Sequence, residues 1–197
     1  MKNHGQLRII AGEDHGRRLQ SPSDIKIRPT SGIAREAIFN ILQQRIPGCD
    51  FLDLYAGTGA VGLEALSRGA GTVTFVEHNR QGVELLHDNI FRMTRSGDCR
   101  LWSGSVANQC KRFEREQRTF DLIFIDPPYD QQGIEIRFLE PLLSVNGILI
   151  FQRPIKKTVG NPFKSTRLEQ YDLRHYGKTE ISFWTFPENL IQGEPEP

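Results

Sequence analysis

Two short motifs in this sequence combine residue types that could perform chemistry together. The first runs from Asp53 to Gly62, reads DLYAGTGAVG, and places Gly57 and Gly59 between an apolar run and an amphipathic stretch. Glycine lets the backbone approach a ligand closely, and a helix that begins there offers unpaired N–H groups. Glu77 ends the next apolar run, where a carboxylate can accept the hydroxyls of a ribose. The pattern predicts a site for a nucleotide-type cofactor.

The glycine spacing also satisfies G-x-G-x-x-G, so an NAD(P)-dependent oxidoreductase is one alternative, and an ordinary strand–helix turn is another. Two features favour S-adenosylmethionine. The negative charge of Asp53 would repel a pyrophosphate but could orient a cation or an ammonium group. Tyr55 and Ala56 also lengthen the turn before the first glycine.

The second motif, Asp126-Pro127-Pro128-Tyr129, follows the apolar run 120–125. These residue types suit methylation of an exocyclic amine, whose lone pair is delocalised into a planar base. The Asp126 carboxylate and the Pro127 carbonyl could accept the two amine hydrogens and turn the lone pair toward a methyl donor. The Tyr129 ring offers a stacking surface for an extruded base, a contact worth about 1–3 kcal/mol in nucleic-acid binders.

The elements that must position these motifs follow an alternating pattern. Apolar strands are predicted at 51–54, 72–77, 99–102, 120–125 and 147–152, and helices between them at 60–68, 79–95, 105–117 and 133–144. Two further extended runs, 166–176 and 179–186, predict a closing hairpin. Continuous apolar strands joined by helices indicate an α/β fold with a mostly parallel sheet covered on both faces. Ligands bind such sheets at the carboxyl ends of the strands, where both motifs fall.

The chain begins with a small N-terminal extension. Runs 7–11 and 17–21 around a glycine-bounded turn predict a hairpin. A helix capped by Thr30 or Ser31 should follow and end before Pro47, with an apolar stripe formed by Ile33, Ala37, Ile38, Ile41 and Leu42. We predict three parts: the extension 1–46, a catalytic core 47–186, and a flexible acidic tail 187–197.

Composition excludes several classes of protein. Apolar residues make up 38% of the 197 residues, which fits one globular domain and excludes a disordered chain. The three cysteines are odd in number and lack C-x-x-C spacing, and the five histidines are scattered, so no disulfide framework or metal site is predicted. No apolar run could cross a bilayer and no secretory signal begins the chain, so we expect a cytoplasmic protein without membrane contact.

Charge is distributed unevenly along the chain. Residues 1–46 carry eight Lys or Arg against four Asp or Glu, and residues 151–178 carry seven against two. The segment 47–150 carries ten against fourteen, and residues 179–197 have four acids and no base. Basic flanks around an acidic centre suit a polyanionic partner, although solvated surface charge is the alternative.

The two motifs together resemble the class I S-adenosylmethionine-dependent N-methyltransferases. More narrowly, the chain resembles the bacterial 16S ribosomal RNA guanine-N2 methyltransferase family. The segments LRIIAGEDHGRRL, RPTSGIAREAIFNIL, LDLYAGTGAVGLEALSRGA, FVEHNR, DPPY and YGKTEISFW follow that family's order over nearly the whole chain. The resemblance implies a Rossmann-like fold with a seven-stranded sheet, and methyl transfer to a guanine N2 in small-subunit ribosomal RNA.

The resemblance also implies site residues. Asp126, Pro127 and Tyr129 would receive the guanine, and Arg17 and Arg18 would meet RNA phosphates. The residues implied to hold S-adenosylmethionine are Arg28, Thr30, Asp53, Ala56, Gly57, Gly59, Glu77 and Ser105. The chain departs from the family pattern at Ser105, where an Asp or Asn is usual, and at the two residues after Glu77.

The partner would be small-subunit ribosomal RNA or the assembled subunit, and we expect a monomer. A DNA amino-methyltransferase is the nearest alternative, because the second motif suits an exocyclic amine and does not distinguish ribose from deoxyribose. The short chain leaves little room for a separate target-recognition domain. A non-catalytic RNA-binding module is a further alternative.

Overall fold

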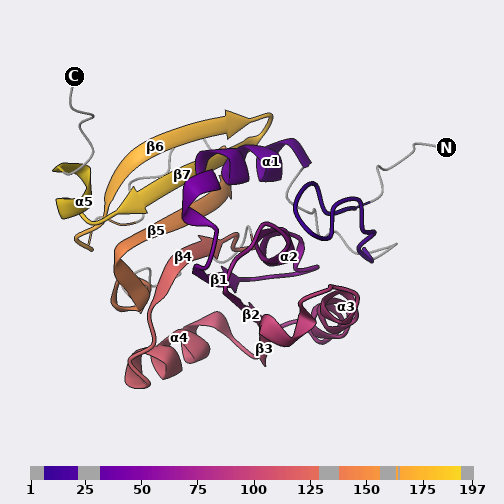
Figure 1. Cartoon of the computed structure of the whole chain (residues 1–197). Coiled ribbons are helices and arrows are strands. Elements are labelled where there is room, and N and C mark those ends of the chain that lie inside the picture. The colour runs from indigo at the N-terminus through magenta and orange to yellow at the C-terminus, as the bar shows by residue number, and fades with distance from the viewer. Residues whose placement is uncertain (1–6, 22–31, 129–137, 156–162, 164, 192–197) are drawn as a thin grey trace.

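A seven-stranded sheet with helices on both faces forms the protein (Figure 1). The computed structural model describes residues 7–21, 32–128, 138–155, 163 and 165–191. The strands lie in the order β3-β2-β1-β4-β5-β7-β6. The elements are α1 (Gly32–Ile41), η1 (Gln43–Arg45), β1 (Asp50–Leu54), α2 (Ala60–Ser67), β2 (Thr72–Glu77), α3 (Arg80–Phe91), η2 (Ser96–Asp98), β3 (Cys99–Ser103), α4 (Val106–Arg115), β4 (Phe120–Ile125), η4 (Glu140–Leu142), β5 (Leu143–Pro154), β6 (Glu169–Tyr176), β7 (Thr179–Thr185) and α5 (Glu188–Ile191).

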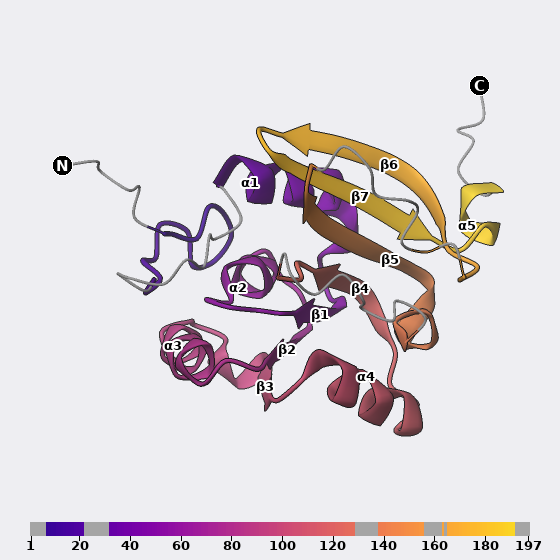
Figure 2. The ribbon, with the colours of Figure 1, turned by 180° about the vertical axis from the view of Figure 1, so that it is seen from behind.

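Strands β3, β2, β1, β4 and β5 are mutually parallel. Strand β7 runs antiparallel to β5 and to β6, and the pair extends the sheet beyond β5 (Figure 2). The predicted α/β class, with a mostly parallel seven-stranded Rossmann-like sheet and a closing hairpin, is confirmed.

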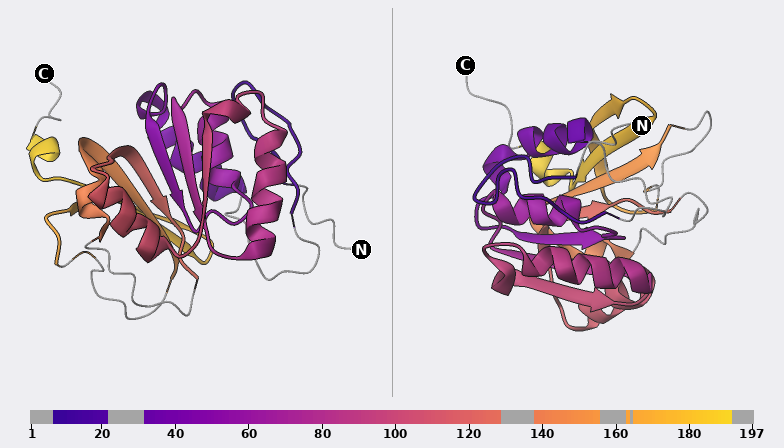
Figure 3. Two further views of the ribbon diagram at one scale, coloured as in Figure 1. Left: turned by 90° about the horizontal axis from the view of Figure 1, so that it is seen from below. Right: turned by 90° about the vertical axis from the view of Figure 1, so that its right-hand side faces the viewer.

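The sheet divides the core into two layers, and Figure 3 shows helices along both of its faces. One layer packs α1, α2 and α3 against the sheet together with Ile9 and Leu19 of the N-terminal segment. The other packs α4 against the sheet with Phe163 and Trp184. All eight residues of α2 are buried, because the helix lies between the sheet and the N-terminal segment. The described part of the N-terminal extension and the sheet therefore share one hydrophobic layer.

The predicted N-terminal hairpin is present in reduced form. Residues 7–21 fold back through one antiparallel bridge between Arg8 and Arg18, and Leu19 donates its N–H to the Leu7 carbonyl over 2.9 Å. Two polar residues of α2 anchor this segment. The Glu64 carboxylate accepts the N–H groups of residues 10 and 11, and the Ser67 hydroxyl donates to the residue 11 carbonyl over 2.6 Å.

The predicted apolar stripe of α1 is confirmed at Ile38 and Leu42, which are buried, and wrong at Ile33 and Ile41. Ile33 is 72% exposed and Ile41 is 37% exposed, whereas Arg35 and Phe39 are buried. The Arg35 guanidinium lies beside the buried Glu64 carboxylate and donates to the carbonyl of residue 8 over 2.5 Å. A buried charge needs such partners, so the buried face of α1 includes Arg35, a residue that hydrophobicity alone does not select.

Two predicted helices end elsewhere than expected. Helix α3 stops at Phe91 instead of residue 95, because the Asp14 carboxylate accepts the Thr94 N–H and draws the chain out of the helix. The helix predicted over 133–144 lies partly outside the described residues, and its described part contains no α-helix. Leu143 already pairs with β4, and Pro141, which has no N–H, lies in the short η4 turn.

The segment predicted as a flexible tail begins with the short helix α5. Asn189 of that helix donates to the Val145 carbonyl and to the Thr185 hydroxyl, each over 2.8 Å. These two bonds fasten the helix to the ends of β5 and β7. Among the described residues, no helix has the length and apolar character needed to cross a membrane.

Candidate active site

The carboxyl ends of β1, β2 and β4 bring three acidic residues to one edge of the sheet. Leu54 at the end of β1 pairs with Val76 of β2 and with Ile125 of β4. Glu77 and Asp126 are the next residues on those strands, so they flank the turn that leaves β1. Asp53 lies one residue before Leu54. Burial is the largest cause that raises the pKa of Asp53, and the nearby charges of Asp126 and Glu77 raise it further. The two motifs therefore meet in space.

Asp53 lies beneath the glycine turn with only 1% of its surface exposed. Its Oδ2 accepts the Gly62 N–H over 2.9 Å, and Gly62 is the third residue of α2, where a helix N–H has no partner within the helix. Burial is the main reason that the pKa of Asp53 lies well above its ordinary value. Asp53 therefore fixes the start of α2, a role that the motif alone did not predict.

The turn between β1 and α2 depends on glycine. Gly57 and Gly59 have φ values of +55° and +76°, in the left-handed region that side chains with a Cβ rarely adopt. A Cβ on Gly59 would lie 2.2 Å from the Leu86 side chain of α3. Tyr55 also has φ of +60°, an uncommon conformation for a bulky residue that concentrates at ligand sites. The turn therefore has an uncommon backbone conformation at the position where the sequence predicted a cofactor.

Glu77 connects this turn with the start of α3. Its Oε2 accepts the Gly57 N–H over 2.8 Å, while Oε1 accepts the N–H groups of His78 and Asn79 over 2.8 and 2.6 Å. A carboxylate has about four acceptor positions, so these bonds leave one, on Oε2, for a further donor. Glu77 is thus oriented by backbone amides and can still accept a hydroxyl.

Ser105 lies at the same edge, two residues after Ser103, which pairs with Glu77. It is exposed, and its hydroxyl caps α4 by accepting the Asn108 N–H over 3.3 Å. The hydroxyl keeps its own hydrogen for donation. Ser105 therefore caps α4 and keeps a hydroxyl hydrogen that it can donate.

Asp126 follows β4 and is bound by a residue that the sequence analysis did not single out. The Gln152 amide, on the adjacent strand β5, donates to Asp126 Oδ2 over 2.7 Å. Gln152 is buried, with 6% of its surface exposed. Burial raises the pKa of Asp126 to about 7, and the Gln152 bond acts in the opposite direction by stabilising the charged form. The sequence did contain a signal for this contact: Gln152 is a polar residue at the end of the apolar run 147–152.

Pro127 and Pro128 follow Asp126 as irregular backbone, Pro127 half-buried and Pro128 exposed. Neither has an N–H, so this stretch presents carbonyl groups without backbone donors. Tyr129, Arg28 and Thr30 lie outside the described residues. The structure thus brings together Asp53, Ala56, Gly57, Gly59, Glu77, Ser105, Asp126 and Pro127 of the predicted set.

Arg17 and Arg18 lie on the N-terminal segment and not at the sheet edge that carries Asp53, Glu77 and Asp126. Both are exposed. The Arg17 Nε lies 2.6 Å from the buried Asp14 carboxylate, and its guanidinium also contacts the Arg92 carbonyl at the end of α3. Arg17 therefore fastens the segment to α3, while Arg18 projects from the bridge with Arg8.

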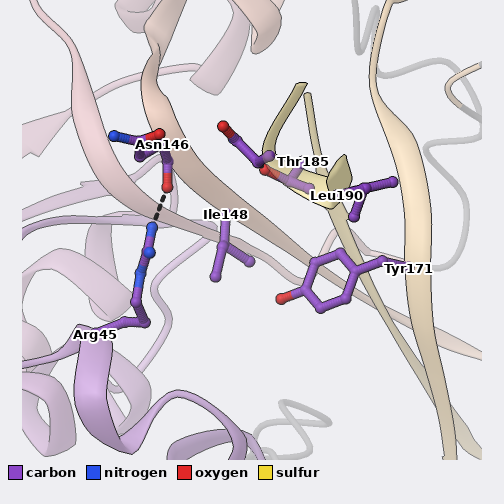
Figure 4. Close-up of a pocket in the computed structure, with 7 residues that line it drawn as sticks. Arg45, Asn146, Ile148, Tyr171, Thr185 and Leu190 are labelled. Carbon is purple, nitrogen blue, oxygen red and sulfur yellow. Dashed lines mark hydrogen bonds between the residues drawn. The ribbon is translucent and has the colours of Figure 1, made fainter. Parts of the chain in front are cut away.

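A cavity of about 590 Å³ lies elsewhere, between η1, β5, β6 and α5 (Figure 4). Its lining includes Arg45, Asn146, Ile148 and Tyr171, and none of the described residues of the predicted site. Ile148 lies in the first half of β5, away from the edge that carries Asp126. Among the described residues, no group of three or more His, Cys, Asp or Glu side chains could hold a metal ion.

A protein-family profile described as conserved hypothetical protein 95 matches residues 7–185. The chain belongs to this family. The protein named ribosomal RNA small subunit methyltransferase D in Haemophilus influenzae is 31% identical over 174 residues, which cover 84% of this chain and 88% of that protein. Its namesake in Escherichia coli K12 is 36% identical over 132 residues, covering 66% of this chain and 64% of that protein.

Solved structures agree with this membership. Hypothetical protein TTHA0928 of Thermus thermophilus has a TM-score of 0.74 at 30% identity and covers 90% of this chain and 98% of its own. The protein SMU.776, solved with bound SAH, has a TM-score of 0.61 at 19% identity, covers 76% of this chain and 48% of its own, and shows the shared fold. The predicted methyltransferase family and class I methyltransferase fold are confirmed.

Proposed function

We propose that this protein transfers a methyl group from S-adenosylmethionine to the exocyclic N2 of a guanine in small-subunit ribosomal RNA. One observation carries the proposal: Asp126, followed by two prolines, lies beside the glycine turn at one edge of the sheet. The relatives named as small-subunit ribosomal RNA methyltransferases support the same interpretation. The geometry of the site supports the reaction class, and the named relatives support the RNA target.

The residues present fit S-adenosylmethionine. Gly57 and Gly59 adopt left-handed backbone conformations that favour glycine, and a Cβ on Gly59 would collide with the Leu86 side chain. Glu77 keeps one acceptor position for a ribose hydroxyl. Buried carboxylates at this edge favour a cationic ligand and disfavour the pyrophosphate of a dinucleotide. When bound, S-adenosylmethionine supplies an activated methyl group attached to a positively charged sulfur.

Asp126 would act on the amine of the target base. Its carboxylate accepts one N2 hydrogen and the Pro127 carbonyl accepts the other, which turns the amine lone pair out of conjugation with the ring. As the N–C bond forms, the methyl–sulfur bond would break and leave its electron pair on the sulfur, and N2 loses one proton, which the Asp126 carboxylate takes up. Gln152 holds Oδ2, so that Oδ1 is free to face the base. Tyr129 would stack on the base.

RNA contacts would come from the basic flanks. Arg18 is exposed on the N-terminal segment, and Arg17 lies next to it in the chain. Both can meet phosphates, a contact that positions the substrate without reading sequence. Arg28 and Thr30 would complete the cofactor site. We propose that the protein acts as a monomer in the cytoplasm, on either free ribosomal RNA or the assembled small subunit.

The test is transfer of labelled methyl from S-adenosylmethionine to unmodified small ribosomal subunits, beside naked ribosomal RNA and duplex DNA. Digestion to nucleosides should place the label in N2-methylguanosine, and Asp126→Ala should abolish it while RNA binding is retained. Label in DNA alone would support the DNA amino-methyltransferase instead. A rise in Tm with NAD(P) and none with S-adenosylmethionine would support the oxidoreductase.

A further inference from the structure

Asn89 joins three elements that surround the cofactor turn. It lies in the last turn of α3 and has no exposed surface. Its Nδ2 donates to the Thr58 carbonyl over 2.9 Å and to the Gln20 carbonyl over 3.1 Å, while its Oδ1 accepts the Gln20 N–H over 2.7 Å. One side chain therefore binds the glycine turn, α3 and the end of the N-terminal segment.

These contacts differ from those of the other anchors of the N-terminal segment. Glu64 and Ser67 bind residues 10, 11 and 14 to α2 and do not contact the turn. Asn89 uses both of its amide hydrogens, and one of them goes to Thr58, between Gly57 and Gly59. Thr58 is itself buried, with 4% of its surface exposed. The Thr58 carbonyl thus faces the interior, where Asn89 is its described partner.

We propose that Asn89 is a positioning residue for the cofactor, which holds the glycine turn in the conformation that S-adenosylmethionine requires. The inference rests on the proposed function for the identity of the ligand. Removing the amide would leave the Thr58 carbonyl buried without its donor, and the turn would have to move to satisfy it. The movement would reach Gly57 and Gly59 directly, because Thr58 lies between them.

The experiment compares Asn89→Ala with the control Ser67→Ala. Both variants lose a buried polar anchor of the N-terminal segment, but only Asn89 contacts the turn. We expect both to have a lower Tm. We expect Asn89→Ala alone to raise the Kd and the KM for S-adenosylmethionine by about tenfold or more, with kcat at saturating cofactor changed less than about threefold. Isothermal titration well below Tm gives the Kd.

Asn89→Ser provides a second variant if Asn89→Ala does not fold. The hydroxyl keeps one donor on a shorter side chain, so an intermediate Kd is expected. Wild-type affinity in a folded Asn89→Ala or Asn89→Ser protein, with a Tm loss like that of Ser67→Ala, would overturn the positioning role. Failure of the wild-type protein to bind S-adenosylmethionine would overturn the proposed cofactor itself. The wild-type Kd is therefore measured before any variant is compared.

Discussion

Replacing Gln152 with leucine should move the pH dependence of catalysis. Gln152 donates over 2.7 Å to Asp126, a carboxyl group whose pKa burial raises to about 7. The bond stabilises the ionised form, so Gln152→Leu should raise the pKa of Asp126 further. Because the ionised carboxylate accepts the amine hydrogen, activity should rise with pH through this pKa. The variant should therefore need a higher pH to reach the same activity.

The magnitude follows from the strength of one hydrogen bond. A bond to a charged group contributes about 1.5–3 kcal/mol, equivalent to about one to two pKa units. With the pKa moved from about 7 to about 8–9, the ionised fraction of Asp126 at pH 7 falls about 5- to 50-fold. At pH 9.5 most of the variant is ionised again, so most of the loss should be recovered.

The assay is kcat/KM for the RNA substrate between pH 5.5 and 9.5, a parameter that reports the ionisation of the free enzyme. Gln170→Leu makes the same chemical change at an exposed position of β6 and should leave the profile unchanged. A loss in Gln152→Leu that is equal at every pH would refute the reasoning, because it would show that Gln152 acts through packing and not through the charge of Asp126.

Three further predictions concern stability and the cofactor turn. Asp126→Asn should raise Tm at pH 8 but not at pH 4. The pKa of Asp126 is about 7 in the folded state and about 3.9 in the unfolded state, so ionisation of Asp126 lowers stability as the pH rises between these values. An equal gain in Tm at both pH values would contradict this linkage. Glu64→Ala should lower the free energy of unfolding in urea by about 3–5 kcal/mol, because it strips the buried Arg35 of its carboxylate; the exposed Glu84→Ala is the control, and equal losses would contradict a special role for the buried pair. Gly59→Ala should abolish S-adenosylmethionine binding in titration calorimetry, since a Cβ there meets a leucine side chain at 2.2 Å and φ is +76°; unchanged affinity would show that the turn tolerates a side chain.

The N-terminal segment shows how far polar contacts organise this fold. Glu64 has no exposed surface, yet it accepts two backbone N–H groups and lies beside Arg35 and Arg68. Asp14 is also buried and binds Arg17 and Thr94. These satisfied polar groups hold the segment against α2 and α3 together with the buried side chains of Ile9 and Leu19, because the bridge and backbone bonds between its two runs only join the segment to itself.

The sequence by itself determined the parts of the site that depend on local patterns. Apolar runs that alternate with amphipathic stretches specify a parallel sheet, and parallel strands place their carboxyl ends at a common edge. Asp53, Glu77 and Asp126 were predicted there for that reason, and strand register confirms their placement. Glycine at positions 57 and 59 was informative for a similar local reason, since a left-handed backbone favours that residue.

Only the tertiary structure decided which polar groups become partners. Gln152 and Asp126 are 26 residues apart, and Asn89 and Thr58 are 31 apart, so no local period reveals either bond. The burial of Arg35 on α1 has the same origin, because its partner Glu64 lies on another helix. Sequence periodicity shows which face of an element is apolar. It does not show which polar groups are buried, because burying a polar group requires a partner, and that partner comes from a distant segment that packs against it.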